Sequence, residues 1–179
     1  MKKRALALAA AVATTGVVLT AGPANAIPDP IALLHSAGIP TQQLVEFTTP
    51  QGGMFYSAKP AEQRWAVTNN KFKRTTTPLG QVATKPFAGG TPMYRLRDGK
   101  ISSYILTTSP GERDKLTSTG FINEGVVGYV GKSGVADKQI FRLHLDGQPR
   151  WRIAITSHKD KILAGEPGWS LDGPVGYLG

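Results

Sequence analysis

The sequence predicts a mainly β fold with short helices, of the α+β class, built from three pseudo-repeats of about 48 residues. Two observations predict it: similar stretches recur along the chain, and apolar and polar residues alternate at the start of each copy. One copy alone is too small to bury its apolar face. We therefore expect a single domain closed in a trefoil-like or barrel-like arrangement, because closure removes exposed sheet edges.

The repeat is clearest in the second and third copies, which we place at 91–138 and 139–179. Residues of the same or similar type stand about 48 positions apart: Thr108 and Thr156, Ser109 and Ser157, Glu112 and Asp160, Phe121 and Trp169, Gly128 and Gly176, Tyr129 and Tyr177. A weaker first copy covers 42–90, where Gly80 precedes Gly128 by the same interval. The chain from 42 to 179 is therefore predicted to be one three-repeat domain.

The chain begins with the features of a signal peptide at 1–26, followed by a leader at 27–41. Lys2-Lys3-Arg4 precede a short apolar run, and Ala24-Asn25-Ala26 has the small-residue form of a cleavage site. Asp29-Pro30 predicts the start of a short helix in the leader. We expect a secreted, cysteine-free protein whose net charge falls from +9 to about +6 after cleavage of these residues.

Each repeat is expected to begin with a β-hairpin. In the third copy the apolar residues of 141–145 alternate with polar ones, and Asp146-Gly147 predicts the turn into the second strand. We place Ile153 of that strand in the core, with Phe55 and Ile105 as its counterparts in the other copies. The hairpin should therefore show one face to the core and one to solvent.

A short helix and a last strand complete each repeat. Ser109 as the N-cap and Glu112 three positions on predict a capping box at the helix start, and Ser157 and Asp160 repeat it. We therefore interpret these carboxylates, and Glu62 in the first copy, as structural. The last strand of each copy contains a glycine, which predicts a close approach of two backbones or a bulge.

One run of the second copy resembles a known family. The run contains Thr107-Thr108-Ser109, Glu112-Arg113, Glu124-Gly125 and Tyr129-Val130, and it is similar to repeat domains of unknown function in secreted bacterial and fungal proteins. The similarity is good over 92–131, fair over 139–179 and weak over 42–90. Because members are often appended to exported peptidases and glycoside hydrolases, the resemblance implies an accessory role such as attachment to a substrate or surface.

The sequence contains no recognised catalytic signature. Neither His-Glu-x-x-His nor Gly-x-Ser-x-Gly occurs. His144 and His158 have no second histidine or carboxylate at the spacing of a metal site. We therefore expect a non-catalytic protein with no metal and no cofactor.

The candidate ligand-binding residues belong to the second and third copies: Arg95, Arg142, Trp151, Glu124 and Asp172. Glu124 and Asp172 precede glycines in predicted loops, where functional residues concentrate. Trp151 stands between two arginines and is the leading candidate for an exposed aromatic ring. Aromatic faces stack on sugar rings while planar polar groups orient the hydroxyls, so this set favours saccharide recognition.

We therefore expect a secreted, non-catalytic binding protein for cell-wall or environmental polysaccharide. Two alternatives stay open from the sequence. One is a small secreted hydrolase that uses Glu124 or Asp172, and the other is a protein–protein module or inhibitor with a secreted protein partner. No specific nucleic-acid partner is expected, and no membrane association after removal of the signal peptide.

Overall fold

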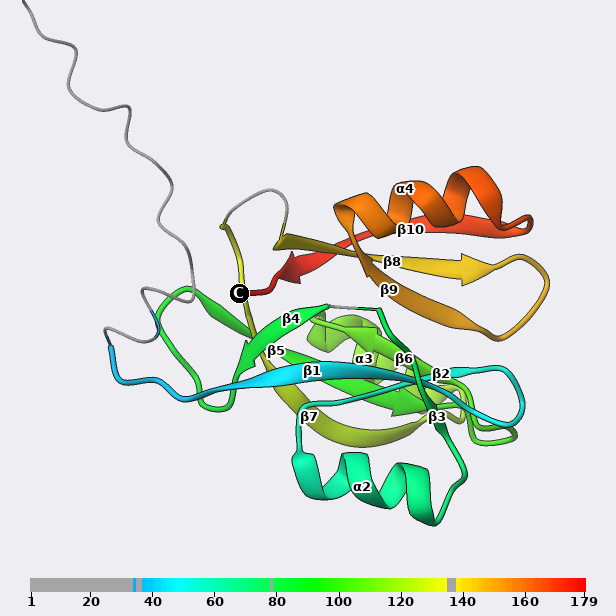
Figure 1. Cartoon of the computed structure of the whole chain (residues 1–179), viewed down its shortest axis with the longest axis horizontal. Coiled ribbons are helices and arrows are strands. Elements are labelled where there is room, and N and C mark those ends of the chain that lie inside the picture. Colours follow the sequence, from blue (N-terminus) through cyan, green and yellow to red (C-terminus); the bar gives the residue numbers. More distant parts are fainter. Residues whose placement is uncertain (1–33, 35–36, 78, 135–137) are drawn as a thin grey trace, which may run out of the picture.

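The computed structural model describes residues 34, 37–77, 79–134 and 138–179 (Figure 1). The predicted signal peptide lies outside these residues, as do 27–33 and 35–36 of the leader, which include the predicted helix start. Leu34 of the leader is described; it is helical and its side chain is buried. Among the described residues, no helix has the length and apolar character needed to cross a membrane.

The same order of elements, a hairpin followed by a helix and a strand, occurs three times along the chain. The first unit comprises β1 (Thr41–Thr48), β2 (Met54–Ser57), α2 (Pro60–Thr68), β3 (Lys73–Arg74) and β4 (Gly80–Ala83). The second comprises β5 (Gly90–Arg97), β6 (Tyr104–Thr107), α3 (Pro110–Ser118) and β7 (Ile122–Gly131). The third comprises β8 (Gln139–Leu145), β9 (Trp151–Ile155), α4 (Thr156–Gly165) and β10 (Trp169–Tyr177).

The strands form one antiparallel sheet of ten strands, with the three helices packed outside it (Figure 1). The predicted mainly β, α+β class is confirmed, but the predicted barrel-like closure is wrong. Long ladders run within each unit, whereas a single residue pair joins β4 to β7 and another joins β7 to β10: Ala83 with Tyr129, and Gly131 with Tyr177. Barrel closure would need long ladders between units, and these short contacts cannot supply them.

Three glycines allow the units to approach each other at these strand ends. A Cβ atom on Gly128 would lie 2.4 Å from Val82 Cγ2, and one on Gly176 would lie 2.6 Å from Val130 Cγ2. A Cβ on Gly80 would lie 2.8 Å from the carbonyl oxygen of Gly179. Side chains at these three positions would therefore push the units apart, which confirms the predicted close approach of backbones.

The last residue described also joins the first unit. The Gln81 amide donates to the Gly179 carbonyl at 2.8 Å, and the Gly179 amide donates to the Gln81 carbonyl at 3.0 Å. Figure 1 shows the C-terminal end beside β4. The ends of β4, β7 and β10 thus meet in a ring, although the sheet does not close into a barrel.

The largest core cluster contains one buried residue from the second strand of each hairpin: Tyr56, Leu106 and Ile153. These residues pair with equivalent positions on the first strands: Glu46, Arg95 and Arg142. Phe55, Ile105 and Ile153 are all buried as predicted. However, the strand pairing aligns Ile153 with Tyr56 and Leu106 rather than with Phe55 and Ile105. The predicted alignment of the copies is therefore one residue out of register here, and a shift of one residue exchanges the two faces of a strand.

The predicted capping box is half right in α3. Ser109 Oγ accepts a hydrogen bond from the Glu112 amide at 3.2 Å, but the Glu112 carboxylate turns to Thr107 and Arg142 instead of returning to the Ser109 amide. The prediction for the third copy is wrong, because α4 begins at Thr156 and its start has no side-chain cap. The helix carboxylates are therefore available for contacts between units.

Candidate functional site

Arg95 on β5 joins the first unit to the second. Its Nη2 lies 2.6 Å from Glu62 Oε1 on α2, and its Nε lies 2.8 Å from Glu124 Oε2 on β7. Its Nη1 donates to the Tyr56 carbonyl at 2.6 Å and to Glu62 Oε2 at 3.2 Å. The guanidinium also stacks over the Phe55 ring, with its carbon 4.4 Å from the ring centroid. We call Arg95, Glu62 and Glu124 the Arg95 cluster.

Arg142 on β8 makes the same contacts between the second and third units. Its Nη2 lies 2.7 Å from Glu112 Oε1 on α3, and its Nε lies 2.6 Å from Asp172 Oδ2 on β10. Its Nη1 donates to the Leu106 carbonyl at 3.2 Å. This Arg142 cluster, comprising Arg142, Glu112 and Asp172, repeats the Arg95 cluster bond for bond.

The contact between the third and first units carries the opposite charges. The position of Arg95 and Arg142 is taken by Glu46, which is fully buried. Its carboxylate accepts from Arg152 Nη2 at 3.2 Å and from the Tyr56 hydroxyl at 2.8 Å. Arg152 stands at the strand position of Phe55 and Ile105. This contact is therefore also an ion pair, but its arginine lies on a second strand and not at the helix position of Glu62 and Glu112.

A hydroxyl group at the end of the preceding strand fixes each helix carboxylate. Ser57 donates to Glu62, and Thr107 donates to Glu112, each at 2.5 Å. Burial raises the pKa of Glu62, but the hydrogen bonds from Arg95 and Ser57 outweigh it and hold this pKa below its usual value. Glu112 has a lowered pKa for the same reasons, with Arg142 and Thr107 as the donors. Both carboxylates are therefore held in the ionised form.

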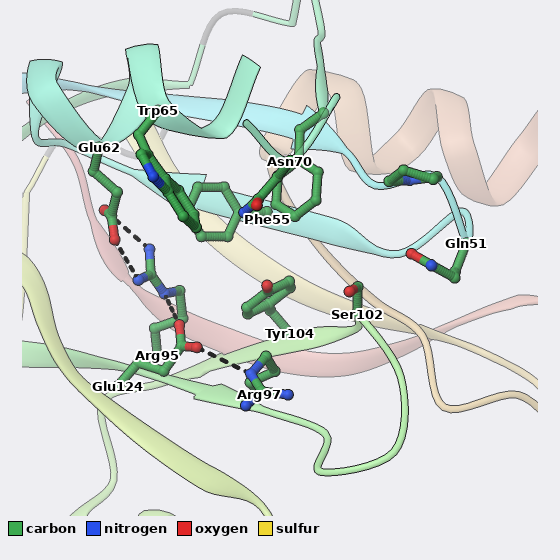
Figure 2. Close-up of a pocket in the computed structure, with 12 residues that line it drawn as sticks. Gln51, Phe55, Glu62, Trp65, Asn70, Arg95, Arg97, Ser102, Tyr104 and Glu124 are labelled. Atoms are coloured by element: carbon green, nitrogen blue, oxygen red, sulfur yellow. Dashed lines mark hydrogen bonds and ion pairs between the residues drawn. The ribbon is translucent and has the colours of Figure 1, made fainter. Parts of the chain in front are cut away.

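An open pocket of about 520 Å³ lies beside the Arg95 cluster, a size usual for small-molecule sites (Figure 2). Its aromatic lining comes from Phe55, Phe72, Tyr104 and Trp65. Its polar lining comes from the Arg95 cluster, Arg97, Gln51, Asn70 and Ser102. We call this cavity the Trp65 pocket; it is walled by rings, by a fixed set of charges and by neutral hydrogen-bonding groups.

Trp65 is the exposed aromatic residue of this pocket. Its side chain is 53% exposed, and Figure 2 shows Trp65 and Glu62 projecting from the same side of α2. The two residues are three positions apart, so they share a helix face. Phe55 and Tyr104 beneath them are almost fully buried and meet edge to face at 5.0 Å between ring centroids. The pocket therefore has a rigid aromatic floor and one accessible ring.

The predicted binding residues separate into two places. The structure brings Arg95 and Glu124 together in the Trp65 pocket, and it brings Arg142 and Asp172 together in the Arg142 cluster. Trp151 is not the exposed ring that we expected. It is half-buried and packs edge to face on Phe121, with the ring centroids 5.8 Å apart.

Sequence reasoning missed Trp65, Phe55, Tyr104 and Arg97 as pocket residues. Arg97 was detectable in principle, since it follows Arg95 by two positions and so lies on the same strand face. Its Nε donates to Glu124 Oε1 at 3.2 Å. No group of three or more His, Cys, Asp or Glu residues suited to a metal ion occurs in the described part of the chain. The site can thus bind and orient a ligand through rings, amides, hydroxyls and paired charges.

The fold and the pocket together define a mainly β module of three joined units with an aromatic-walled cavity between the first two. Residues 44–178 match a family described as a domain of unknown function (DUF5648), and the chain belongs to this family. The match includes most of the first unit, where the similarity of the sequence to the family's repeat is weak. No curated protein and no solved structure matches the chain.

Proposed function

We propose that this chain is an exported, non-catalytic binding module that holds part of a cell-wall or environmental polysaccharide in the Trp65 pocket. The observation that carries the proposal is the 53% exposed Trp65 ring beside fixed polar groups. An accessible indole gives a sugar ring a flat apolar face at low entropic cost. Export is proposed from the signal-peptide features of 1–26.

The polar lining suits a ligand that carries many hydroxyl groups. Carboxylates accept hydrogen bonds, guanidinium groups donate them, and the amides of Gln51 and Asn70 do both. A sugar hydroxyl also donates and accepts, so it can satisfy each type of partner. The burial of rings beneath these groups leaves the lining rigid, which lowers the entropic cost of binding.

A hydrolase that uses Glu124 or Asp172 is less well supported by the contacts. Glu124 Oε2 accepts from Arg95 and its Oε1 from Arg97. Asp172 Oδ2 accepts from Arg142 and its Oδ1 lies 2.5 Å from His144 Nδ1. A general acid must carry a proton that it can donate, whereas each oxygen of these two carboxylates already faces an arginine or histidine nitrogen. Binding without turnover therefore explains the geometry with fewer requirements.

The proposal is tested by titrating the purified protein with a panel of soluble oligosaccharides and following tryptophan fluorescence and binding heat. We expect binding of at least one sugar, with an affinity that falls about tenfold or more in Trp65→Ala, equal to ~1.4 kcal/mol or more. Val67→Ala is the matched control, because Val67 is 45% exposed on the same helix but does not line the pocket.

Two results would contradict the proposal. One is an affinity for the sugar that is the same in Trp65→Ala as in the unmodified protein. The other is the failure of every sugar in the panel to bind while a secreted protein is retained from culture supernatant, which would favour the protein–protein alternative.

A further inference from the structure

We infer that the Trp65 pocket selects uncharged sugar units and rejects units that carry a carboxylate, sulfate or phosphate group. This inference rests on the proposed function and names the ligand class of the same site. It runs against the charge of the whole chain, which is +9 and by itself favours anionic polymers. The reason lies in how the charges of the lining are paired.

The charged residues that line the pocket cancel each other. Glu62 and Glu124 supply two negative charges, and Arg95 and Arg97 supply two positive ones. The four groups are linked by ion pairs of 2.6 to 3.2 Å. Among the residues that line the pocket, an anionic ligand therefore meets no net positive charge that would repay the loss of its hydration.

Arg95 has few hydrogen-bond donors left for an anion. Its Nε is bonded to Glu124, its Nη1 to the Tyr56 carbonyl and Glu62, and its Nη2 to Glu62. Its side chain is also only 8% exposed. A ligand carboxylate would have to displace Glu62 or Glu124 from this arginine, leaving a desolvated carboxylate behind.

Arg97 is the more accessible cation of the pocket, since its side chain is 33% exposed. Its Nε is tied to Glu124 Oε1 at 3.2 Å, so an anion bound at Arg97 would lie close to the Glu124 carboxylate. Like charges at such a distance repel. A hydroxyl group has the opposite preference, because it can accept from Arg97 and donate to Glu124 at once.

The second unit offers a control that matches Glu62 closely. Glu112 occupies the same place on its helix, accepts from a strand-end hydroxyl in the same way and is bonded by two nitrogens of Arg142. It does not line the Trp65 pocket. Glu62→Gln and Glu112→Gln therefore make equal changes in chemistry and fold contacts, and differ in whether the pocket gains a positive charge.

The test compares a neutral oligosaccharide that binds the pocket with the same oligosaccharide oxidised at C6 to a uronate. In the unmodified protein we expect the neutral sugar to bind at least tenfold more tightly by titration calorimetry. Its affinity should change less than twofold between low and high salt, because no net charge is neutralised. Glu62→Gln should lower the ratio of the neutral-sugar affinity to the uronate affinity at least threefold, and Glu112→Gln should leave this ratio unchanged.

Glu124→Gln provides a second variant that keeps the Arg95–Glu62 pair, in case Glu62→Gln does not fold. It too should narrow the preference. Uronate binding that equals or exceeds binding of the neutral sugar, and that is lost in Trp65→Ala, would overturn this inference and leave the proposed function intact. The inference would also be overturned if Glu62→Gln and Glu124→Gln both kept the preference of the unmodified protein for the neutral sugar. Absence of binding by both sugars would overturn the proposed function, and this inference with it.

Discussion

The Arg95 and Arg142 clusters have the same hydrogen-bond pattern but different surroundings. Beside the Arg95 cluster lies a pocket of about 520 Å³, whereas the cavity beside the Arg142 cluster measures about 130 Å³ and, apart from the cluster itself, is lined by residues 107–109 and 173–175. Three equivalent positions differ between the two places: Trp65 against Lys115, Tyr104 against Trp151, and Arg97 against His144. The ion pairs therefore join the units, while a few side chains around them decide whether a binding pocket forms.

The Arg142 cluster has different side chains at the positions equivalent to the walls of the Trp65 pocket. Trp151 packs on Phe121 at 5.8 Å between ring centroids, where the equivalent Tyr104 and Phe72 are 6.4 Å apart. His144 takes the place of the longer Arg97 and contacts Asp172 and Asp146. At the equivalent positions, the Arg142 cluster thus has a larger ring and a shorter polar chain.

The largest expected effect comes from removing the two arginines. Arg95→Ala should lower the free energy of unfolding by about 4 kcal/mol, because it leaves two carboxylates and a buried carbonyl without their partner. Arg142→Ala should cost about 2 kcal/mol, since the Arg142 side chain is more exposed than that of Arg95 (15% against 8%) and its bond to the buried carbonyl is longer (3.2 Å against 2.6 Å). Urea denaturation measures both values. Equal losses in the two variants would show that the clusters do not differ in burial as described.

The next largest effect separates the two tryptophans. Trp151→Ala should lower the free energy of unfolding by about 2 kcal/mol, because the half-buried ring leaves a cavity against Phe121, and sugar binding should persist. Trp65→Ala should change stability by about 0.5 kcal/mol or less while sugar binding falls. Thermal unfolding and titration on the same samples measure both effects. If Trp151→Ala lost sugar binding without losing stability, the ligand would bind at the Arg142 cluster instead of in the Trp65 pocket.

A smaller effect is expected from acid. The pKa values of Glu62 and Glu112 are lowered in the folded protein, so their contribution to stability is present above the ordinary carboxyl pKa of about 4.3 and is lost as the pH falls through the lowered values. The melting temperature should therefore drop less steeply below about pH 4.3 in the double variant Glu62→Gln/Glu112→Gln than in the unmodified protein. Parallel curves would contradict the pKa assignment.

The smallest expected effect is that of Lys115→Trp, which places an indole on α3 at the position of Trp65 on α2. The side chain is on the helix surface, so the free energy of unfolding should change by about 0.5 kcal/mol or less. No second sugar site should appear, because Trp151 still fills the space beside it. A binding stoichiometry of two by calorimetry would show that a surface indole is sufficient for binding.

Local features of the sequence predicted the parts of the fold that depend on neighbouring residues. The alternation in 141–145 and the Asp146-Gly147 turn correspond to the β8–β9 hairpin. Ser109 is the N-cap of α3. The spacing of the glycines indicated the contacts between strand ends. Each of these features is determined within a few positions, or by comparison of equivalent positions.

The rest depended on distant contacts that no local pattern shows. Glu62 was interpreted as a capping residue because a local partner explained it, while its actual partner Arg95 is 33 positions away. Trp65 was missed because α2 has no continuous apolar face to mark which residues point outward. The lack of barrel closure follows from the single residue pairs between units. The length of a repeat does not show how many residue pairs join one unit to the next.

The pairing of Gln81 with Gly179 sets an order on the folding of the chain. The two residues are far apart in sequence, and closing such a long loop is entropically costly and slow. During synthesis, β4 and β7 are available long before Gly179 emerges, so the contact between the first two units can form without it. The Trp65 pocket lies at that earlier contact, while the third unit and the ring of strand ends are completed last.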